Sequence, residues 1–370
     1  MEVDNLVFTD DSAEMEALGK QFYDSRKDIY TQKMTESIFQ TIEKYIPNAD
    51  EMEKKKIFFR SIYDYWMYGV NVNEEFYLHF TDMKHETKLS YLTYRNRFLY
   101  YHHLNNKQDE HILNDKYESY LTLKDFYQRE VILLDGEDDY PQFEDFVRNH
   151  ASFVVKPLSM AWGQGVHKVN TSDYKDTRTL FNVLIKEGLE LGNTGQPSAL
   201  VLEEIINQHE EMSRLHPWSV NGVRCTTIRV KDKVHIFHPH LKLGAYKHFV
   251  TSSTSGTLDA CIDPETGIVI TLGKTKRGES FRYHPTTGVE IPGFRIPEWN
   301  ALIDTATKLS DALPQIRYVG WDLVLTNNGW VAMEGNFTGN FTSQFILEKG
   351  LKYELEELIG WKPKQLVWWE

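Results

Sequence analysis

The stretch that decides the fold is YVGWDLVLTNNGWVAMEGN, residues 318–336, in which two apolar runs flank an Asn-Asn-Gly segment. Short apolar runs on either side of turn residues are typical of a β-hairpin. If the Asn-Asn-Gly segment forms a three-residue loop with its glycine in the left-handed conformation, Thr326 pairs with Trp330. Counting back along the two strands then places Asp322 opposite Glu334.

This register gives the hairpin one apolar and one polar face, because successive side chains of a strand point to opposite sides. Asn336 lies on the polar face, two residues beyond Glu334. A two-residue Asn-Gly turn would instead shift the register and place the two acidic residues on opposite faces, so the prediction depends on the loop. The side chains expected on the apolar face are Trp321, Leu323, Leu325, Val331 and Met333.

The polar face of the hairpin predicts a metal site. Two directly opposed carboxylates repel each other unless a cation lies between them. Carboxylate, amide and phosphate oxygens together are a typical set of ligands for Mg²⁺. Asp322, Glu334 and Asn336 are therefore the candidate ligands. The alternative is a hairpin whose acidic residues are only solvated.

A second informative segment is FVVKPLSMAWGQGV, residues 153–166, in which an apolar strand ends at Lys156 and a glycine-containing loop follows. Glycines allow backbone N–H groups to approach phosphate oxygens closely, and a lysine supplies charge for the same anion. This pattern predicts nucleotide binding. It matches neither the P-loop nor the Rossmann motif. The alternative is a β-hairpin that contains glycine and an exposed lysine.

Composition limits the classes of function. The chain has 370 residues, enough for about two domains, with 41 Lys and Arg against 54 Asp and Glu and a net charge of −13. The negative charge opposes binding to nucleic acid or to an anionic membrane. Two cysteines are too few for a disulfide framework. No apolar run approaches the roughly 18 residues of a membrane span, and the first residues do not resemble a secretion signal, so we expect a cytoplasmic protein.

The spacing of apolar residues along the sequence changes near residue 110. Residues 1–110 are rich in aromatic side chains and have apolar residues at helical spacing, including a helix expected to be capped by Asn48 and to end at Gly69. From 111 onward, short apolar runs alternate with helical stretches, which indicates mixed α and β structure.

Taken in order, the lysine, the glycine loop, residues 201–206 (VLEEII) and the acidic hairpin resemble the ATP-grasp superfamily. The chain is most similar to its sugar-transfer-associated branch. That closer resemblance rests on WMYG at 66–69, QH at 208–209, SVNGVR at 219–224, GWD at 320–322 and EGN at 334–336. It covers nearly the whole chain and is most specific over residues 111–345.

The resemblance implies an α+β ATP-grasp fold, in which two α+β lobes grip ATP, preceded by a helical N-terminal region. The implied parts are the helical region 1–110, an N-lobe with the glycine loop at 111–206 and a C-lobe with the metal-binding hairpin at 207–370. Lys116 and Lys156 would be the two nucleotide lysines. The other implied nucleotide contacts are Ser159, Gly163, Gln164 and Gly165 over the phosphates, Glu203, Glu204 and Ile206 at adenine, and Glu210 at the ribose, with Gln208 as its rival.

Two further cations have implied catalytic roles. Arg224 and Lys242 would hold the γ-phosphate and an acylphosphate intermediate. The sequence departs from the pattern of this branch in two places. Lys242 stands where arginine is more common and cannot bind in a bidentate way. Residues 247–249 (KHF) stand where an Asp-Asn pair is expected.

The function that the resemblance implies is an ATP- and Mg²⁺-dependent carboxylate–amine ligase that works through an acylphosphate. By analogy, its substrates would be a small-molecule or glycan-linked carboxylate and amine, such as a sugar acid or an amino acid, in polysaccharide or glycan modification. A phosphotransferase on the same fold and a non-catalytic nucleotide-binding protein are the alternatives.

Overall fold

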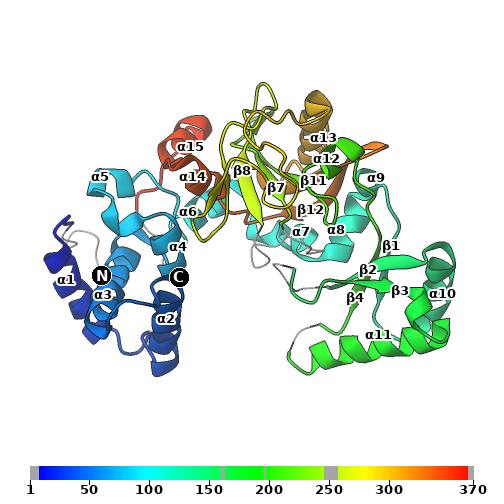
Figure 1. Ribbon diagram of the computed structural model, residues 1–370, viewed down its shortest axis with the longest axis horizontal. Helices are drawn as coiled ribbons and strands as arrows, with labels where there is room; N and C mark the ends of the chain where they lie inside the picture. The colour runs from blue at the N-terminus through cyan, green and yellow to red at the C-terminus, as the bar shows by residue number, and fades with distance from the viewer. Residues whose placement is uncertain (1–7, 159, 161–162, 196, 246–256, 366–370) are drawn as a thin grey trace. The chain divides into compact units, whose positions relative to one another are not determined.

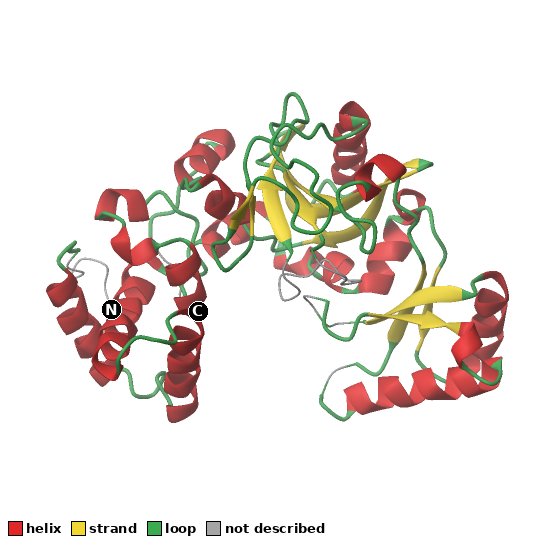
Figure 2. Ribbon diagram, viewed as in Figure 1, coloured by secondary structure: helices red, strands yellow, loops and turns green. Residues whose placement is uncertain are grey.

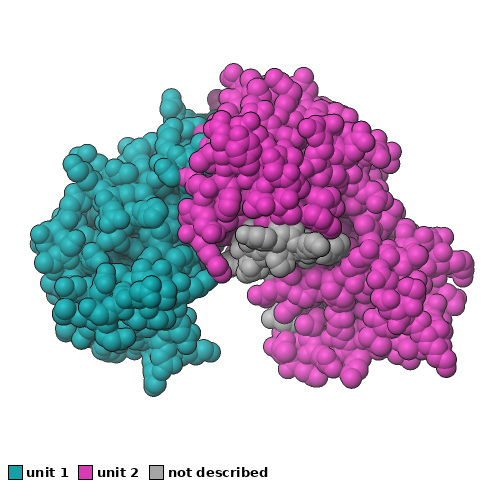
Figure 3. Space-filling view, viewed as in Figure 1, with its two compact units in different colours: residues 1–104, 341–370 teal, residues 105–340 magenta. Residues whose placement is uncertain are grey.

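The computed structural model describes residues 8–158, 160, 163–195, 197–245 and 257–365. The chain divides into two compact units (Figure 3). The first comprises Met1–Leu104 and Phe341–Glu370, and the second comprises Asn105–Asn340. In the part of the chain that the structure describes, no helix has both the length and the apolar character to span a membrane.

The described residues of the first unit form helices and no strands, as predicted for the N-terminal region (Figure 2). The longest helix, α3, begins after Asp50, whose side chain accepts a hydrogen bond from the Glu53 N–H, and not after Asn48 as expected. It ends at Gly69, where a φ of 72° permits the left-handed cap. The helices are α1 (Ser12–Ser25), α2 (Gln32–Tyr45), α3 (Glu51–Tyr68), α4 (Val72–Tyr77), η2 (Phe80–Asp82), α5 (His85–Lys88), α6 (Arg97–Leu104), α14 (Thr342–Leu347) and α15 (Lys352–Ile359).

The last two helices belong to the first unit, whereas the sequence placed residues 207–370 in one lobe. The Gln344 side chain accepts a hydrogen bond from the Leu92 N–H at 2.8 Å and donates one to the Leu92 carbonyl at 3.0 Å. The Tyr100 hydroxyl donates to Glu356 at 2.6 Å. These side-chain contacts join segments more than 200 residues apart, which periodicity does not reveal.

The second unit contains two antiparallel sheets, and the expected boundary near residue 206 falls between them (Figure 1). The first sheet has the order β1-β4-β2-β3. Helices α10 (Tyr140–Asn149) and α11 (Thr177–Gly192) cover one of its faces. Its strands are β1 (Val131–Leu134), β2 (Ser152–Pro157), β3 (His167–Asn170) and β4 (Leu200–Glu204).

Alternation along β2 and β4 decides which side chains face these helices. Phe153, Val155 and Leu202 are buried in the cluster that includes α10 and α11. Lys156 and Glu203 therefore lie on the opposite face of the sheet.

The second sheet has the order β10-β9-β8-β7-β5-β11-β12, and β6 pairs with β5. Its strands are β5 (Gly222–Val230), β6 (Lys233–Ile236), β7 (His240–Leu243), β8 (Leu258–Cys261), β9 (Gly273–Lys274), β10 (Ser280–Phe281), β11 (Tyr318–Thr326) and β12 (Gly329–Asn336). The short helices of this unit are η3 (Lys107–Asp109), α7 (His111–Asn114), α8 (Lys116–Thr122), α9 (Lys124–Tyr127), η4 (Glu137–Asp139), η5 (Thr171–Asp173) and α12 (Glu210–Ser213).

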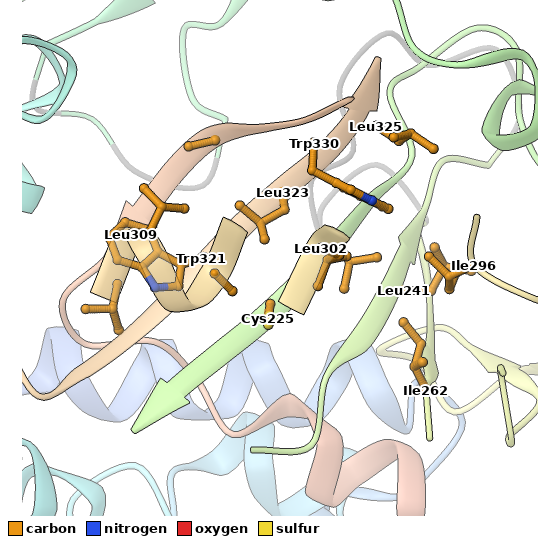
Figure 4. Close-up of a cluster of buried hydrophobic side chains, with 14 of the residues drawn as sticks. Cys225, Leu241, Ile262, Ile296, Leu302, Leu309, Trp321, Leu323, Leu325 and Trp330 are labelled. Carbon is orange, nitrogen blue, oxygen red and sulfur yellow. The ribbon is translucent and has the colours of Figure 1, made fainter. Parts of the chain in front are cut away.

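One face of the second sheet carries the main core of the unit. Helix α13 (Trp299–Ala312) packs on this face through Leu302 and Leu309, against Trp321 and Leu323 of β11 (Figure 4). Because this face is apolar, the alternate residues of the same strands are left to form a polar face.

Candidate functional site

The hairpin β11–β12 pairs Asp322 with Glu334, as the sequence predicted, but it reaches that register by a different route. The loop has two residues, and Thr326 pairs with Gly329, not with Trp330. A β-bulge between the Leu323–Ala332 pair and the Asp322–Glu334 pair then adds one residue. That extra residue is Met333. Without it, the two-residue loop would have placed Met333 opposite Asp322.

The bulge also explains an error in the predicted apolar face. Trp330 and Ala332, paired with Leu325 and Leu323, belong to the buried core. Val331 and Met333, which were expected there, do not belong to that cluster. The prediction therefore paired the two acidic residues correctly but assigned the side chains in the first half of β12 to the wrong faces of the sheet.

The polar face of the second sheet brings Asp322 together with both predicted catalytic cations. Asp322 pairs with Arg224 across β11 and β5. Arg224 Nε donates to Oδ1 at 2.7 Å and Nη2 donates to Oδ2 at 2.9 Å. Lys242 Nζ donates to Oδ2 at 3.2 Å. Burial alone would raise the pKa of Asp322, but the charges of Arg224 and Lys242 bring it well below its ordinary value.

The side-chain oxygen atoms of the three predicted metal ligands are suited to a hard cation. Oδ2 of Asp322 accepts two hydrogen bonds and Oδ1 accepts one, so Oδ1 has a lone pair to spare. No described residue donates a hydrogen bond to the Glu334 carboxylate. Asn336 Nδ2 donates to the Gly320 carbonyl at 3.2 Å, which orients its amide.

A protein-only metal cage does not form here. The described residues contain no group of three or more His, Cys, Asp or Glu side chains suited to hold a metal ion. Two carboxylates and one amide instead suit Mg²⁺ that takes its other ligands from phosphate and water.

The two predicted nucleotide lysines lie on helix α8 and on strand β2 of the first sheet. Lys116 begins α8, and its Nζ donates to the carbonyls of Leu158 at 3.0 Å and Met160 at 2.6 Å, at the start of the glycine loop. Burial lowers the pKa of Lys116, and the negative charge of Glu334 opposes that shift. Lys156 Nζ lies 2.7 Å from Glu203 Oε1.

The glycine loop is described only in part. Gly163 and Gly165 have φ angles of 73° and 70°, which glycine adopts without strain. A Cβ atom on Gly165 would lie 2.6 Å from Pro157 Cγ, so this position also has no room for a side chain. Gln164 is exposed between them. Ser159 lies outside the described residues.

Glu203, expected at adenine, has internal partners for both its backbone and its side chain. Its backbone pairs with β1 on one side and β2 on the other. Its carboxylate lies between Lys156 and Arg129, whose Nη2 donates to Oε2 at 2.8 Å. Burial by itself would raise the pKa of Glu203, but the charges of Lys156 and Arg129 lower it to about 2.

The other hinge candidates lie at the end of β4 and after it. Glu204 ends the strand, and its side chain accepts a hydrogen bond from the Glu130 N–H at 3.1 Å. Ile206 is partly exposed beyond the strand, and Glu210 is exposed at the start of α12.

Gln208, the rival of Glu210, uses both ends of its amide within the protein. Its Nε2 donates to the carbonyls of His216 and Ser219, and its Oε1 accepts from the backbone and side-chain nitrogens of Asn221. The ribose assignment is therefore better placed on Glu210.

Sequence reasoning did not assign roles to three buried polar residues near these groups. Arg129 binds Glu203, His240 pairs with Arg224 across β7 and β5, and Asp259 pairs with Lys242 across β8 and β7. Burial, with the nearby Arg224 and Lys242 charges, lowers the pKa of His240 to about 3. His240 and Asp259 alternate with core residues in HLKL and LDAC, a pattern that could have revealed them.

The comparisons with known proteins come from sequence and from structure. The model of the family described as sugar-transfer associated ATP-grasp matches residues 95–359, well over half of the chain. The protein therefore belongs to the sugar-transfer associated ATP-grasp family, and its fold is the α+β ATP-grasp fold preceded by a helical region. None of the curated proteins compared with the chain matches it.

The similarity of this chain to solved structures is weaker than its match to the family model. D-alanine–D-alanine ligase from Helicobacter pylori has a TM-score of 0.41 and 15% identity, covering 68% of this chain and 62% of that one. D-alanyl-alanine synthetase A from Vibrio cholerae gives 0.40 and 13%, covering 66% and 64%. Phosphoribosylamine–glycine ligase from Thermotoga maritima gives 0.40 and 10%, covering 63% and 49%. The chain thus spans less than two thirds of these proteins, and the family assignment rests on the sequence match.

Proposed function

We propose that this protein is an ATP- and Mg²⁺-dependent carboxylate–amine ligase that works through an acylphosphate. Membership of the ATP-grasp family supports the use of ATP. The single observation that carries the proposal is the placement of Arg224 and Lys242 on Asp322, with Glu334 on the adjacent strand. Donors for phosphate oxygens and oxygen ligands for a metal thus lie on one sheet face.

The residues of the chain have distinct roles in this proposal. Lys116 and Lys156 bind the phosphates, and Asp322, Glu334 and Asn336 hold Mg²⁺. The bound metal supplies charge neutralisation at the phosphates. Arg224 and Lys242 hold the γ-phosphate while a carboxylate oxygen of the substrate attacks its phosphorus atom and ADP leaves.

In the second half of the reaction, the amine nitrogen attacks the acyl carbon. The bond from that carbon to the phosphate oxygen breaks, inorganic phosphate leaves, and the nitrogen loses a proton. Arg224 and Lys242 stabilise the negative charge on the departing phosphate. The protein contributes mostly position and charge and forms no covalent bond to the substrate.

The proposed substrates are a carboxylate and an amine, small or glycan-linked, with a sugar acid or amino acid as one partner. The association of this family with sugar transfer supports a role in polysaccharide or glycan modification. We propose that the reaction takes place in the cytoplasm.

The test uses the purified full-length chain with Mg-ATP and a panel of sugar acids and amino acids. Hydroxylamine replaces the unknown amine, because it traps an acylphosphate as a hydroxamate. We expect ADP, free phosphate and hydroxamate in equal amounts with the correct carboxylate, and none from the Glu334→Gln variant. A phosphorylated acceptor without free phosphate would indicate a phosphotransferase. Nucleotide binding without turnover across the panel would favour a non-catalytic binding protein.

A further inference from the structure

Arg129, between α9 and β1, is the most fully bonded side chain near the site. Its side chain is only 4% exposed. Nε and Nη2 donate to Glu203 Oε2 at 3.0 and 2.8 Å. Nη1 donates to the Tyr127 and Ala332 carbonyls at 3.2 and 2.7 Å, and Nη2 donates to the Met333 carbonyl at 3.3 Å. A guanidinium has five N–H groups, so each of them has an acceptor.

These acceptors belong to both halves of the candidate site. Glu203 lies on β4 of the first sheet, and its other oxygen binds Lys156 at 2.7 Å. Ala332 and Met333 lie on β12 of the second sheet. Met333 is the extra residue of the bulge that brings Glu334 opposite Asp322. Arg129 is thus bonded to the partner of a nucleotide lysine and to the backbone that sets the metal-binding register.

We propose that Arg129 is a positioning residue, which orients Lys156 through Glu203 and fixes the Met333 bulge that places Glu334 opposite Asp322. This inference rests on the proposed Mg-ATP function. Arg129 need not contact the nucleotide. A bulge leaves backbone groups outside the regular ladder, and a buried carbonyl without a donor is unfavourable. The guanidinium supplies those donors at the place where the register changes.

Only arginine has the geometry for this role. Lysine has three donors on one nitrogen and cannot reach both the Glu203 carboxylate and the two β12 carbonyls as a planar guanidinium does. Arg129→Lys should therefore keep the charge beside Glu203 but lose part of the contact with β12. Arg129→Met should lose both contacts while it keeps a side chain of similar length.

The matched control is Arg229→Met. Arg229 is another buried arginine of the same unit, and its Nη2 donates to Asp311 at 2.6 Å. Among the described residues, its side chain makes no hydrogen bond to Lys156, to Glu203 or to β12, so its loss should lower stability without changing the site.

The first experiment measures hydrogen exchange of residues 331–335 in the full chain without nucleotide. We expect exchange in Arg129→Met to be at least about tenfold faster than in Arg229→Met, with Arg129→Lys in between. Equal exchange in Arg129→Met and Arg229→Met would overturn the proposed effect on the bulge. This result does not depend on nucleotide binding.

The second experiment measures the affinity for a non-hydrolysable ATP analogue with Mg²⁺. We expect Arg129→Met to weaken binding by about tenfold or more and Arg229→Met to change it by less than about twofold. In a Lys156→Ala background, the added effect of Arg129→Met should be smaller than in the wild type, because the part that acts on Lys156 through Glu203 is already lost and only the effect on the bulge remains. Independent, multiplicative losses would refute the coupling.

The outcomes separate this inference from the proposed function. If the wild type binds the analogue and Arg129→Met binds it equally well, the positioning role is wrong and the function stands. If the wild type does not bind the analogue but residues 331–335 exchange faster in Arg129→Met, the nucleotide function is wrong, and only the structural effect on the hairpin is supported.

Discussion

Replacing Glu203 by Gln should lower the stability of the second unit by an amount that the structure sets. The pKa of this carboxyl is about 2 in the folded protein, against an ordinary value of 4.5. The difference of about 2.5 units, at about 1.36 kcal/mol per unit, corresponds to about 3 kcal/mol. The carboxylate is buried, so little of this is lost to solvent screening.

The pH dependence has a defined sign. Because folding lowers the pKa of Glu203, its stabilisation is complete above about pH 4.5 and is lost as the pH falls towards about 2. The same relation gives about 3 kcal/mol at pH 7 and about 2 kcal/mol at pH 3.5. Glu203→Gln should therefore differ most from the wild type at neutral pH, and the difference should shrink in acid.

The assay is native-state hydrogen exchange of the amides in β2 and β4, since a chain with two units need not unfold in one step. Glu190→Gln is the control, because its carboxylate is exposed and its ion pair with Lys186 should contribute less than about 1 kcal/mol. A difference between Glu203→Gln and the wild type that stays constant from pH 7 to pH 3.5 would refute the electrostatic argument. A difference no larger than that of Glu190→Gln would refute it as well.

Three other changes test different parts of the molecule. Glu334→Gln should abolish turnover while the circular dichroism spectrum and the melting temperature stay close to those of the wild type; unchanged turnover would contradict the metal assignment. Lys156→Ala should weaken binding of Mg-ATP in calorimetry by about tenfold or more, and an unaltered affinity would count against the role of the glycine-loop strand. In the first unit, burial and the nearby Asp64 carboxyl raise the pKa of Glu75. Because folding raises this pKa, the wild type loses stability as the pH rises, whereas Glu75→Gln does not. The stability of Glu75→Gln relative to the wild type, measured by urea unfolding, should therefore increase from pH 5 to pH 8. An equal difference at both pH values would argue against that titration.

The hairpin shows how much of the site the sequence could predict. Apolar runs around Asn-Asn-Gly predicted two strands, and the pairing of Asp322 with Glu334 was correct. The loop length was wrong, and the Met333 bulge compensated for that error. A bulge can be stabilised by groups that bind the irregular backbone, and Arg129 donates to the Met333 carbonyl here. Alternation of residue types within one strand carries no information about such a distant partner.

Glu203 illustrates a second limit. The sequence predicted a strand over 200–202 with Glu203 in the segment that follows it, whereas β4 extends through Glu203 to Glu204. The sequence did not predict its internal contacts: the register of three strands aims the side chain at Lys156 and uses the backbone within the sheet. Residue spacing locates a carboxylate along a strand. Whether that carboxylate contacts a ligand or a cationic side chain of the protein depends on the neighbouring strands.

The charges of the site suggest how a nucleotide could bind without leaving any buried charge unpaired. Two of the carboxylates already have cationic partners: Glu203 has Arg129 and Lys156, and Asp322 has Arg224 and Lys242. These groups, with Lys116 and Glu334, comprise five cations and three carboxylates, and the buried Asp259 beside Lys242 is a fourth carboxylate, in a chain of net charge −13. Under the proposed function, phosphate oxygens would take up donors that Asp322 now occupies, while a metal would compensate Asp322 and Glu334. Because ions are exchanged and not newly buried, the desolvation that opposes binding is smaller than for an unpaired cationic pocket.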